Sequence, residues 1–106
     1  MRIAALQHDI VWEDAAATCD LLEPLIAAAA DDGARLVVLT EMFGPGFSLA
    51  ADRIAEPPGG PTEQFLVARA AEQDVWMGGS IPTRDRNDAH PVNRFLLVGP
   101  DGTRHH

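Results

Sequence analysis

Apolar residues along the chain gather in short continuous runs, separated by breaks rich in glycine and proline. The runs at 2–8 and 36–39 predict buried strands, because a strand covered on both faces lacks alternating polar positions. Two later runs predict a third strand over 75–81 and a fourth over 95–98. The chain therefore carries four predicted strands.

Residues 12–33 carry the spacing of an amphipathic helix, with apolar side chains recurring every three or four positions. Asp14 or Glu13 is expected to begin this helix and Gly33 to cap its end. Pro24 predicts a kink or a late start, because proline removes one helical hydrogen bond.

A second helix is predicted after the break at 57–61, which reads PPGGP. Thr62 is expected to cap it, and the helix is expected to run to about residue 73. Residues 48–54 predict a short helix, and residues 83–91 predict a charged surface turn.

The order strand, helix, strand, helix, strand, strand predicts an α/β domain, and the hairpin-like final pair allows a mixed sheet.

Size and charge exclude several classes of protein. At 106 residues the chain is one small domain or part of a larger one. It has no apolar stretch near 18 residues, so no membrane span is expected. The apolar run at its start is too short for a signal peptide, and a cytoplasmic location is therefore expected. The net charge is −8, and all eight cationic side chains are arginines that form no basic stripe. Nucleic-acid binding is therefore not expected.

Cys19 is the only cysteine, so no internal disulfide can form. Its position in the first predicted helix favours a small core residue over a reactive thiol. Asp101, His105 and His106 lie together near the end of the chain, where terminal side chains are commonly frayed. No metal and no other cofactor are expected.

Glu41 follows the strand at 36–39 and opens a loop, 41–47, that contains two glycines. Ligands of α/β sheets gather beyond the carboxyl ends of the strands, so this position predicts a carboxylate at the rim of a pocket. Phe43 and Phe47 are expected to wall the carboxylate, with Phe47 lining the substrate. Pattern alone leaves three alternatives: a solvated loop carboxylate or a helix cap for Glu41, and core packing for Phe47.

Several segments, taken in order, resemble the nitrilase superfamily of carbon–nitrogen hydrolases. They are the first strand with Gln7, residues 36–43, the pair Gly46 and Phe47, residues 57–61, residues 78–82, Asn93, and residues 99–102. Each piece alone is weak, but the ordered set spans essentially the whole chain. The sequences EMF at 41–43 and GGSIP at 78–82 look most like those of the omega-amidase type, which hydrolyses small carboxamides.

The resemblance implies a Glu–Lys–Cys triad, of which only Glu41, as general base, can be placed. The family's lysine normally follows soon after the turn at 99–102, and its cysteine comes later, so Cys19 is not that nucleophile. Residues 1–106 are therefore expected to be a partial carbon-nitrogen hydrolase domain, truncated before the catalytic lysine and cysteine and inactive alone. The substrate implied for the complete enzyme is a small amide or nitrile.

The fold implied by the resemblance is the N-terminal part of an αββα sandwich, with a mixed sheet and helices packed on one face. The full-length protein is expected to be a homo-oligomer. Asn93 resembles a position that braces the site, although a turn-forming asparagine is the alternative. Arg94 replaces a commonly small polar residue and bears on substrate preference.

The sequence also leaves two other classes of function as alternatives. A degenerate homologue would act as a non-catalytic interaction or structural module, because a half-built sandwich leaves sheet edges and an apolar layer uncovered. A glycosidase would pair Glu41 with Asp9 or Glu56, which requires carboxyl groups roughly 5–10 Å apart. No array of sugar-stacking aromatic residues is evident, which disfavours the glycosidase.

Overall fold

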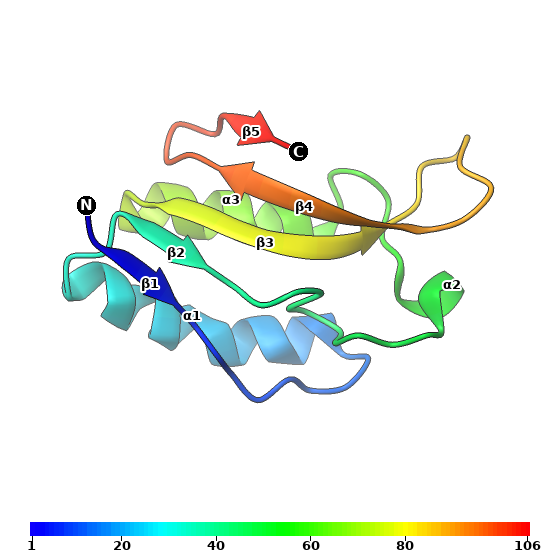
Figure 1. Ribbon diagram of the computed structural model, residues 1–106, viewed down its shortest axis with the longest axis horizontal. Coiled ribbons are helices and arrows are strands. Elements are labelled where there is room, and N and C mark those ends of the chain that lie inside the picture. Colours follow the sequence, from blue (N-terminus) through cyan, green and yellow to red (C-terminus); the bar gives the residue numbers. More distant parts are fainter.

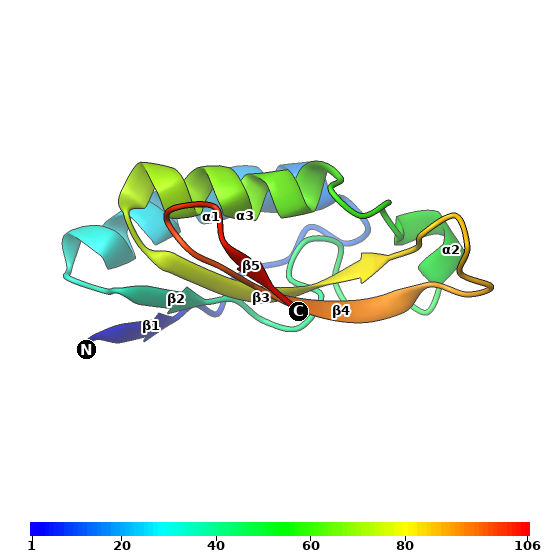
Figure 2. The ribbon, with the colours of Figure 1, turned by 90° about the horizontal axis from the view of Figure 1, so that it is seen from above.

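The computed structural model describes all residues from 1 to 106. Five strands form one sheet, and the two long helices lie side by side over one face of it (Figures 1 and 2). The strands are β1 (Ile3–Ala5), β2 (Leu36–Val38), β3 (Trp76–Thr83), β4 (Val92–Val98) and β5 (Arg104–His105). The helices are α1 (Ala15–Asp31), α2 (Ala51–Ile54) and α3 (Pro61–Gln73). None of them has the length and apolar character required to cross a membrane.

The sheet is mixed, with strand order β1-β2-β3-β4-β5. The first three strands run parallel to one another, and β4 and β5 are antiparallel to their neighbours. This confirms the predicted α/β class, the mixed sheet and the helices on one face. The short strand β5 was missed, because two exposed residues carry no periodic signal; the turn at 99–102 folds them back onto β4.

Helix α1 begins and ends where its capping residues predict. The side chain of Asp14 accepts a hydrogen bond of 3.0 Å from a first-turn amide, and Gly33 follows the last turn with a φ of +95°, a conformation that glycine adopts without steric cost. Pro24 lies inside the helix without ending it. Leu22 and Ile26, on either side of Pro24, are fully buried, and their packing offsets the lost hydrogen bond.

The prediction that the first strand is buried is wrong. β1 has three residues and pairs only with β2, so it forms one edge of the sheet. Ile3 is 59% exposed. The error has a simple cause, because an apolar run looks the same whether a helix covers it or whether it lies at an uncovered edge.

The prediction that Thr62 caps α3 is wrong. The helix begins one residue earlier, at Pro61, with Gly60 as the capping residue, and Thr62 lies within the first turn. Its backbone amide donates a hydrogen bond of 2.8 Å to Oε1 of Glu56, and its hydroxyl donates to the other carboxylate oxygen. A carboxylate from the preceding segment therefore satisfies the helix start.

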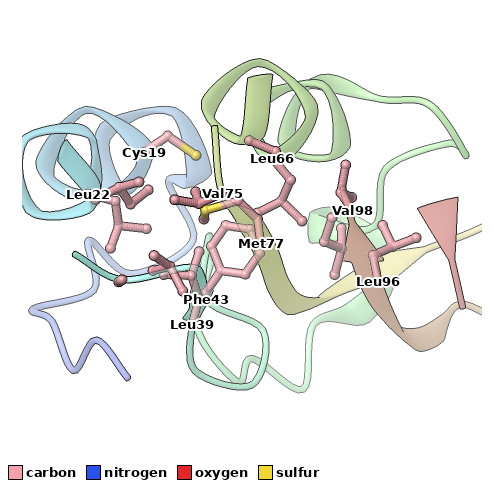
Figure 3. Close-up of a cluster of buried hydrophobic side chains, with 14 residues drawn as sticks. Cys19, Leu22, Leu39, Phe43, Leu66, Val75, Met77, Leu96 and Val98 are labelled. Carbon is pink, nitrogen blue, oxygen red and sulfur yellow. The ribbon is translucent and has the colours of Figure 1, made fainter. Parts of the chain in front are cut away.

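The core lies between the helices and the sheet (Figure 3), where Leu22, Phe43, Leu66 and Met77 are fully buried. The opposite face of the sheet has no helix over it (Figure 2). Alternation along β4 shows the difference between the two faces, because Leu96 and Val98 are buried whereas Phe95 is 52% exposed. The candidate site lies on this open face.

Candidate active site at the end of strand β2

Glu41 lies just beyond the carboxyl end of β2, as predicted. Its side chain lines a cavity of about 330 Å³ together with Leu39, Ser80, Asn93 and Phe95. Residues 80, 93 and 95 come from the neighbouring strands β3 and β4, where Ser80 and Phe95 are direct partners. The structure therefore assembles a pocket from the strand-end loop and the open face of the sheet.

Asn93 holds the carboxylate of Glu41. Its side-chain Nδ2 donates a hydrogen bond of 2.7 Å to Oε1 of Glu41. Asn93 belongs to β4, opposite Pro82, so the turn-forming interpretation is wrong and the bracing geometry is confirmed. The hydrogen bond orients the carboxylate through one oxygen and leaves Oε2 with no hydrogen bond from the chain.

The loop that carries Glu41 is held against two consecutive residues of β3. The backbone amide of Met42 donates a hydrogen bond of 2.7 Å to Oγ of Ser80. The ring of Phe43 packs against Gly79, where an added Cβ would lie only 2.7 Å from the ring. His8 forms a third contact, with its Nε2 3.0 Å from the carbonyl oxygen of Phe43. The two residues that follow Glu41 are therefore held in place by contacts with β3 and with His8.

Glu13 anchors the segment that follows the loop. Oγ of Ser48 donates a hydrogen bond of 2.7 Å to its carboxylate, and Arg53 makes a bidentate contact with it. The hydrogen bond from Ser48, followed by that from Arg53, holds the pKa of Glu13 below its ordinary value. The carboxylate therefore stays ionised and ties residues 48 and 53 to the start of α1.

The prediction that Phe43 and Phe47 wall the carboxylate of Glu41 is wrong. Phe43 is fully buried in the core, and Phe47, which is 58% exposed, does not line the Glu41 cavity. Leu39 and Phe95 form the apolar wall instead. Phe47 lines an adjoining cavity of about 230 Å³ that shares Asn93 with the first. The signal for Phe95 was its position two residues after Asn93, which places both on one face of a strand.

Other candidate residues lie away from Glu41. Arg94 comes between two residues that line the cavity but does not line it, as strand alternation requires. Asp9 is also absent from the cavity wall, and Glu56 lines a different cavity beside Cys19. The structure therefore does not bring a second carboxylate to Glu41, and the glycosidase arrangement is not formed.

Cys19 is a core residue, as predicted. It is 9% exposed, and burial, followed by the nearby carboxylates of Glu56 and Asp20, raises its pKa to about 12. A thiol with this pKa is protonated at neutral pH and is a poor nucleophile. No group of three or more His, Cys, Asp or Glu side chains is placed to hold a metal ion.

Comparison with known proteins identifies the family. Residues 2–105 match the carbon-nitrogen hydrolase family. Omega-amidase YafV from Yersinia enterocolitica is 35% identical over 97% of this chain and 38% of its own length, and omega-amidase YafV from Escherichia coli K12 is 31% identical over 99% of this chain and 39% of its own length. A CN-hydrolase superfamily protein from Xanthomonas campestris has a similar structure, with a TM-score of 0.89 and 33% identity over 99% of this chain and 38% of that one.

The chain therefore belongs to the carbon-nitrogen hydrolase family. The resemblance to the nitrilase superfamily and to its omega-amidase branch is confirmed. The chain spans about two fifths of the length of the curated relatives that it matches, 38% and 39% in the two cases above.

Proposed function

We propose that Glu41 is the general base of an amidase-type hydrolase that converts a small carboxamide into a carboxylate and ammonia. The observation that carries the proposal is the carboxylate of Glu41, held by Asn93 at 2.7 Å in a cavity beyond a strand end. Membership of the carbon-nitrogen hydrolase family supports the same reaction class. The lysine and the nucleophilic cysteine of the triad lie outside residues 1–106 in this proposal.

The proposed reaction has two halves. In the first, Glu41 takes the thiol proton as the cysteine sulfur attacks the amide carbon, and it passes that proton to the nitrogen that leaves as ammonia. The lysine stabilises the negative oxygen of the tetrahedral intermediate. In the second half, Glu41 takes a proton from the water that attacks the thioester carbon and passes this proton to the departing sulfur. The free thiol is restored, and the carboxylic acid that is released ionises to the carboxylate. Because Asn93 occupies Oε1 of Glu41, Oε2 is the oxygen that moves the protons.

Phe47 is proposed to line the part of the site that holds the substrate's carbon chain. Its cavity adjoins that of Glu41 at Asn93. Apolar side chains of Met42, Leu49 and Val92 line the same cavity, which suits a short aliphatic group.

The proposal is tested by ammonia release from small aliphatic amides. The reading frame is sequenced beyond codon 106, and the longest product is assayed beside the 106-residue chain. We expect activity only in the longer product, carrying a lysine and a cysteine downstream, and we expect Glu41→Gln to abolish it. A stop codon after residue 106, or activity that survives Glu41→Gln, would remove the proposal. The first outcome would favour the non-catalytic module, for which the uncovered sheet face provides a surface.

A further inference from the structure

Met42, the residue after Glu41, has an unusual backbone conformation. Its φ is +48°, in the left-handed region that residues with a side chain rarely adopt. This conformation costs on the order of 1 kcal/mol for a residue other than glycine. Met42 is also 6% exposed, so its side chain packs in the interior and cannot leave to relieve the strain. Neighbouring groups must therefore hold the turn in place.

Ser80 supplies the contact that holds this turn. Its Oγ accepts a hydrogen bond of 2.7 Å from the amide of Met42, and Ser80 is 6% exposed. Ser80 belongs to the eight-residue strand β3, where it is buried and pairs with Phe95 of β4, so its position is fixed by the sheet. A short hydrogen bond between a buried amide and a hydroxyl on a central strand fixes the amide in space.

Fixing this amide fixes the direction of the Glu41 side chain. The amide of Met42 and the carbonyl of Glu41 belong to one planar peptide unit. When that plane is held, the dihedral angle ψ of Glu41 is held as well, and the side chain remains on the open face of the sheet. Because Ser80 and Glu41 line the same cavity, the hydrogen bond acts directly beside the site.

We propose that Ser80 is a positioning residue for Glu41, and this inference rests on the proposed role of Glu41 as general base. Ser80 holds the backbone end of the glutamate through Met42, whereas Asn93 holds the carboxylate end. Without the Ser80 hydroxyl, the 41–42 peptide can rotate away from the strained turn. The carboxylate then spends less time in the orientation that accepts the proton. Of the residues that line the cavity, only Ser80 itself changes, by the loss of its hydroxyl group.

The test uses the longer gene product of the assay above and measures kcat and KM separately. Ser80→Ala is expected to lower kcat about tenfold with KM nearly unchanged, the loss of one buried hydrogen bond to the backbone. Ser80→Thr keeps the hydroxyl and is expected to retain most of the kcat. If Ser80→Ala does not fold, Ser80→Cys serves in its place, because sulfur is a weak acceptor of similar size.

A compensating variant separates positioning from simple stability. Glycine adopts a positive φ at no steric cost, so Met42→Gly removes the strain that Ser80 opposes. The double variant Ser80→Ala/Met42→Gly is expected to regain about threefold in kcat over Ser80→Ala, although it loses buried surface and unfolds at a lower temperature. Its KM is expected to rise, because Met42 also lines the cavity proposed for the substrate's carbon chain. If Ser80 only stabilised the fold, the double variant would have a lower kcat than Ser80→Ala, in parallel with its lower unfolding temperature.

The possible results separate the two proposals. A wild-type kcat in Ser80→Ala, combined with an inactive Glu41→Gln, overturns the role of Ser80 and leaves that of Glu41 intact. Equal losses of kcat in Ser80→Ala and Ser80→Thr also overturn it. Activity in Glu41→Gln overturns the proposed function itself, and with it the reason for positioning Glu41.

Discussion

The side-chain amide of Asn93 lies 2.7 Å from the carboxylate of Glu41, although the two residues are 52 positions apart in the sequence. β2 and β4 are the two neighbours of β3, so the hydrogen bond reaches across the central strand. It links a strand-end loop to the beginning of β4. The relationship predicts a measurable role for Asn93.

Replacement of Asn93 by alanine in the longer gene product is expected to lower kcat/KM by about tenfold or more, because hydrogen bonds to charged groups contribute about 1.5–3 kcal/mol. Ammonia release under steady-state conditions measures the effect. Asn87→Ala is the matched control, since Asn87 is exposed and forms no side-chain hydrogen bond. Equal activity in the two variants would show that the Asn93 contact has no part in catalysis.

Gly79 is required for the packing of Phe43. An alanine at 79 would place its Cβ 2.7 Å from a ring that is fully buried, so Gly79→Ala is expected to cost about 1–3 kcal/mol of unfolding free energy. At Gly78, the adjacent control, the nearest atom is the tip of the half-exposed Phe95 ring at 3.1 Å, and that ring can move. Urea unfolding of Gly79→Ala and Gly78→Ala measures both. A loss at 78 as large as that at 79 would contradict the prediction.

Alkaline pH is expected to destabilise the chain through Cys19. The pKa of its thiol is raised from 9.0 to about 12 in the folded state. Between these values the unfolded chain has lost the proton that the folded chain keeps, so the free energy of unfolding falls as pH rises. The slope approaches at most about 1.4 kcal/mol per pH unit, the value for one proton. Below pH 9 this contribution to stability is fully present.

The composition makes this alkaline range simple to interpret. The chain contains no tyrosine and no lysine, and arginine keeps its proton throughout. Unfolding measured from pH 9 to 11.5 is expected to show the decline in the wild type and a flat profile in Cys19→Ala. A decline of the same size in both proteins would assign the effect to another group.

Glu56 is expected to stabilise the start of α3. Its carboxylate accepts hydrogen bonds from both the amide and the hydroxyl of Thr62. Glu56→Ala leaves these donors without that partner and is expected to lower the unfolding free energy by about 1–2 kcal/mol. Asp9→Ala is the control, since Asp9 is exposed and its carboxylate accepts no hydrogen bond from the chain. Thermal unfolding of the two variants tests the difference, and similar midpoints would refute it.

The sequence by itself determined the features that depend on neighbouring residues. The apolar stripe of α1, the cap at Asp14 and the glycine at 33 are local signals, because a helix closes its hydrogen bonds within four residues. The position of Glu41 after an apolar run likewise placed it at a strand end. Together these signals defined the order of the elements and the α/β class.

Only the tertiary structure decided which distant residues meet. Strand order and register bring Asn93, Ser80 and Phe95 to the cavity of Glu41. The tertiary structure also decides that β1 lies at an edge of the sheet and that the carboxylate of Glu56 contacts the start of α3. A shift of one residue in register turns every side chain of a strand to the other face. The hydrophobic pattern of a strand shows which of its residues share a face, but not which residue of the neighbouring strand lies opposite each of them, and the packed sheet decides this pairing.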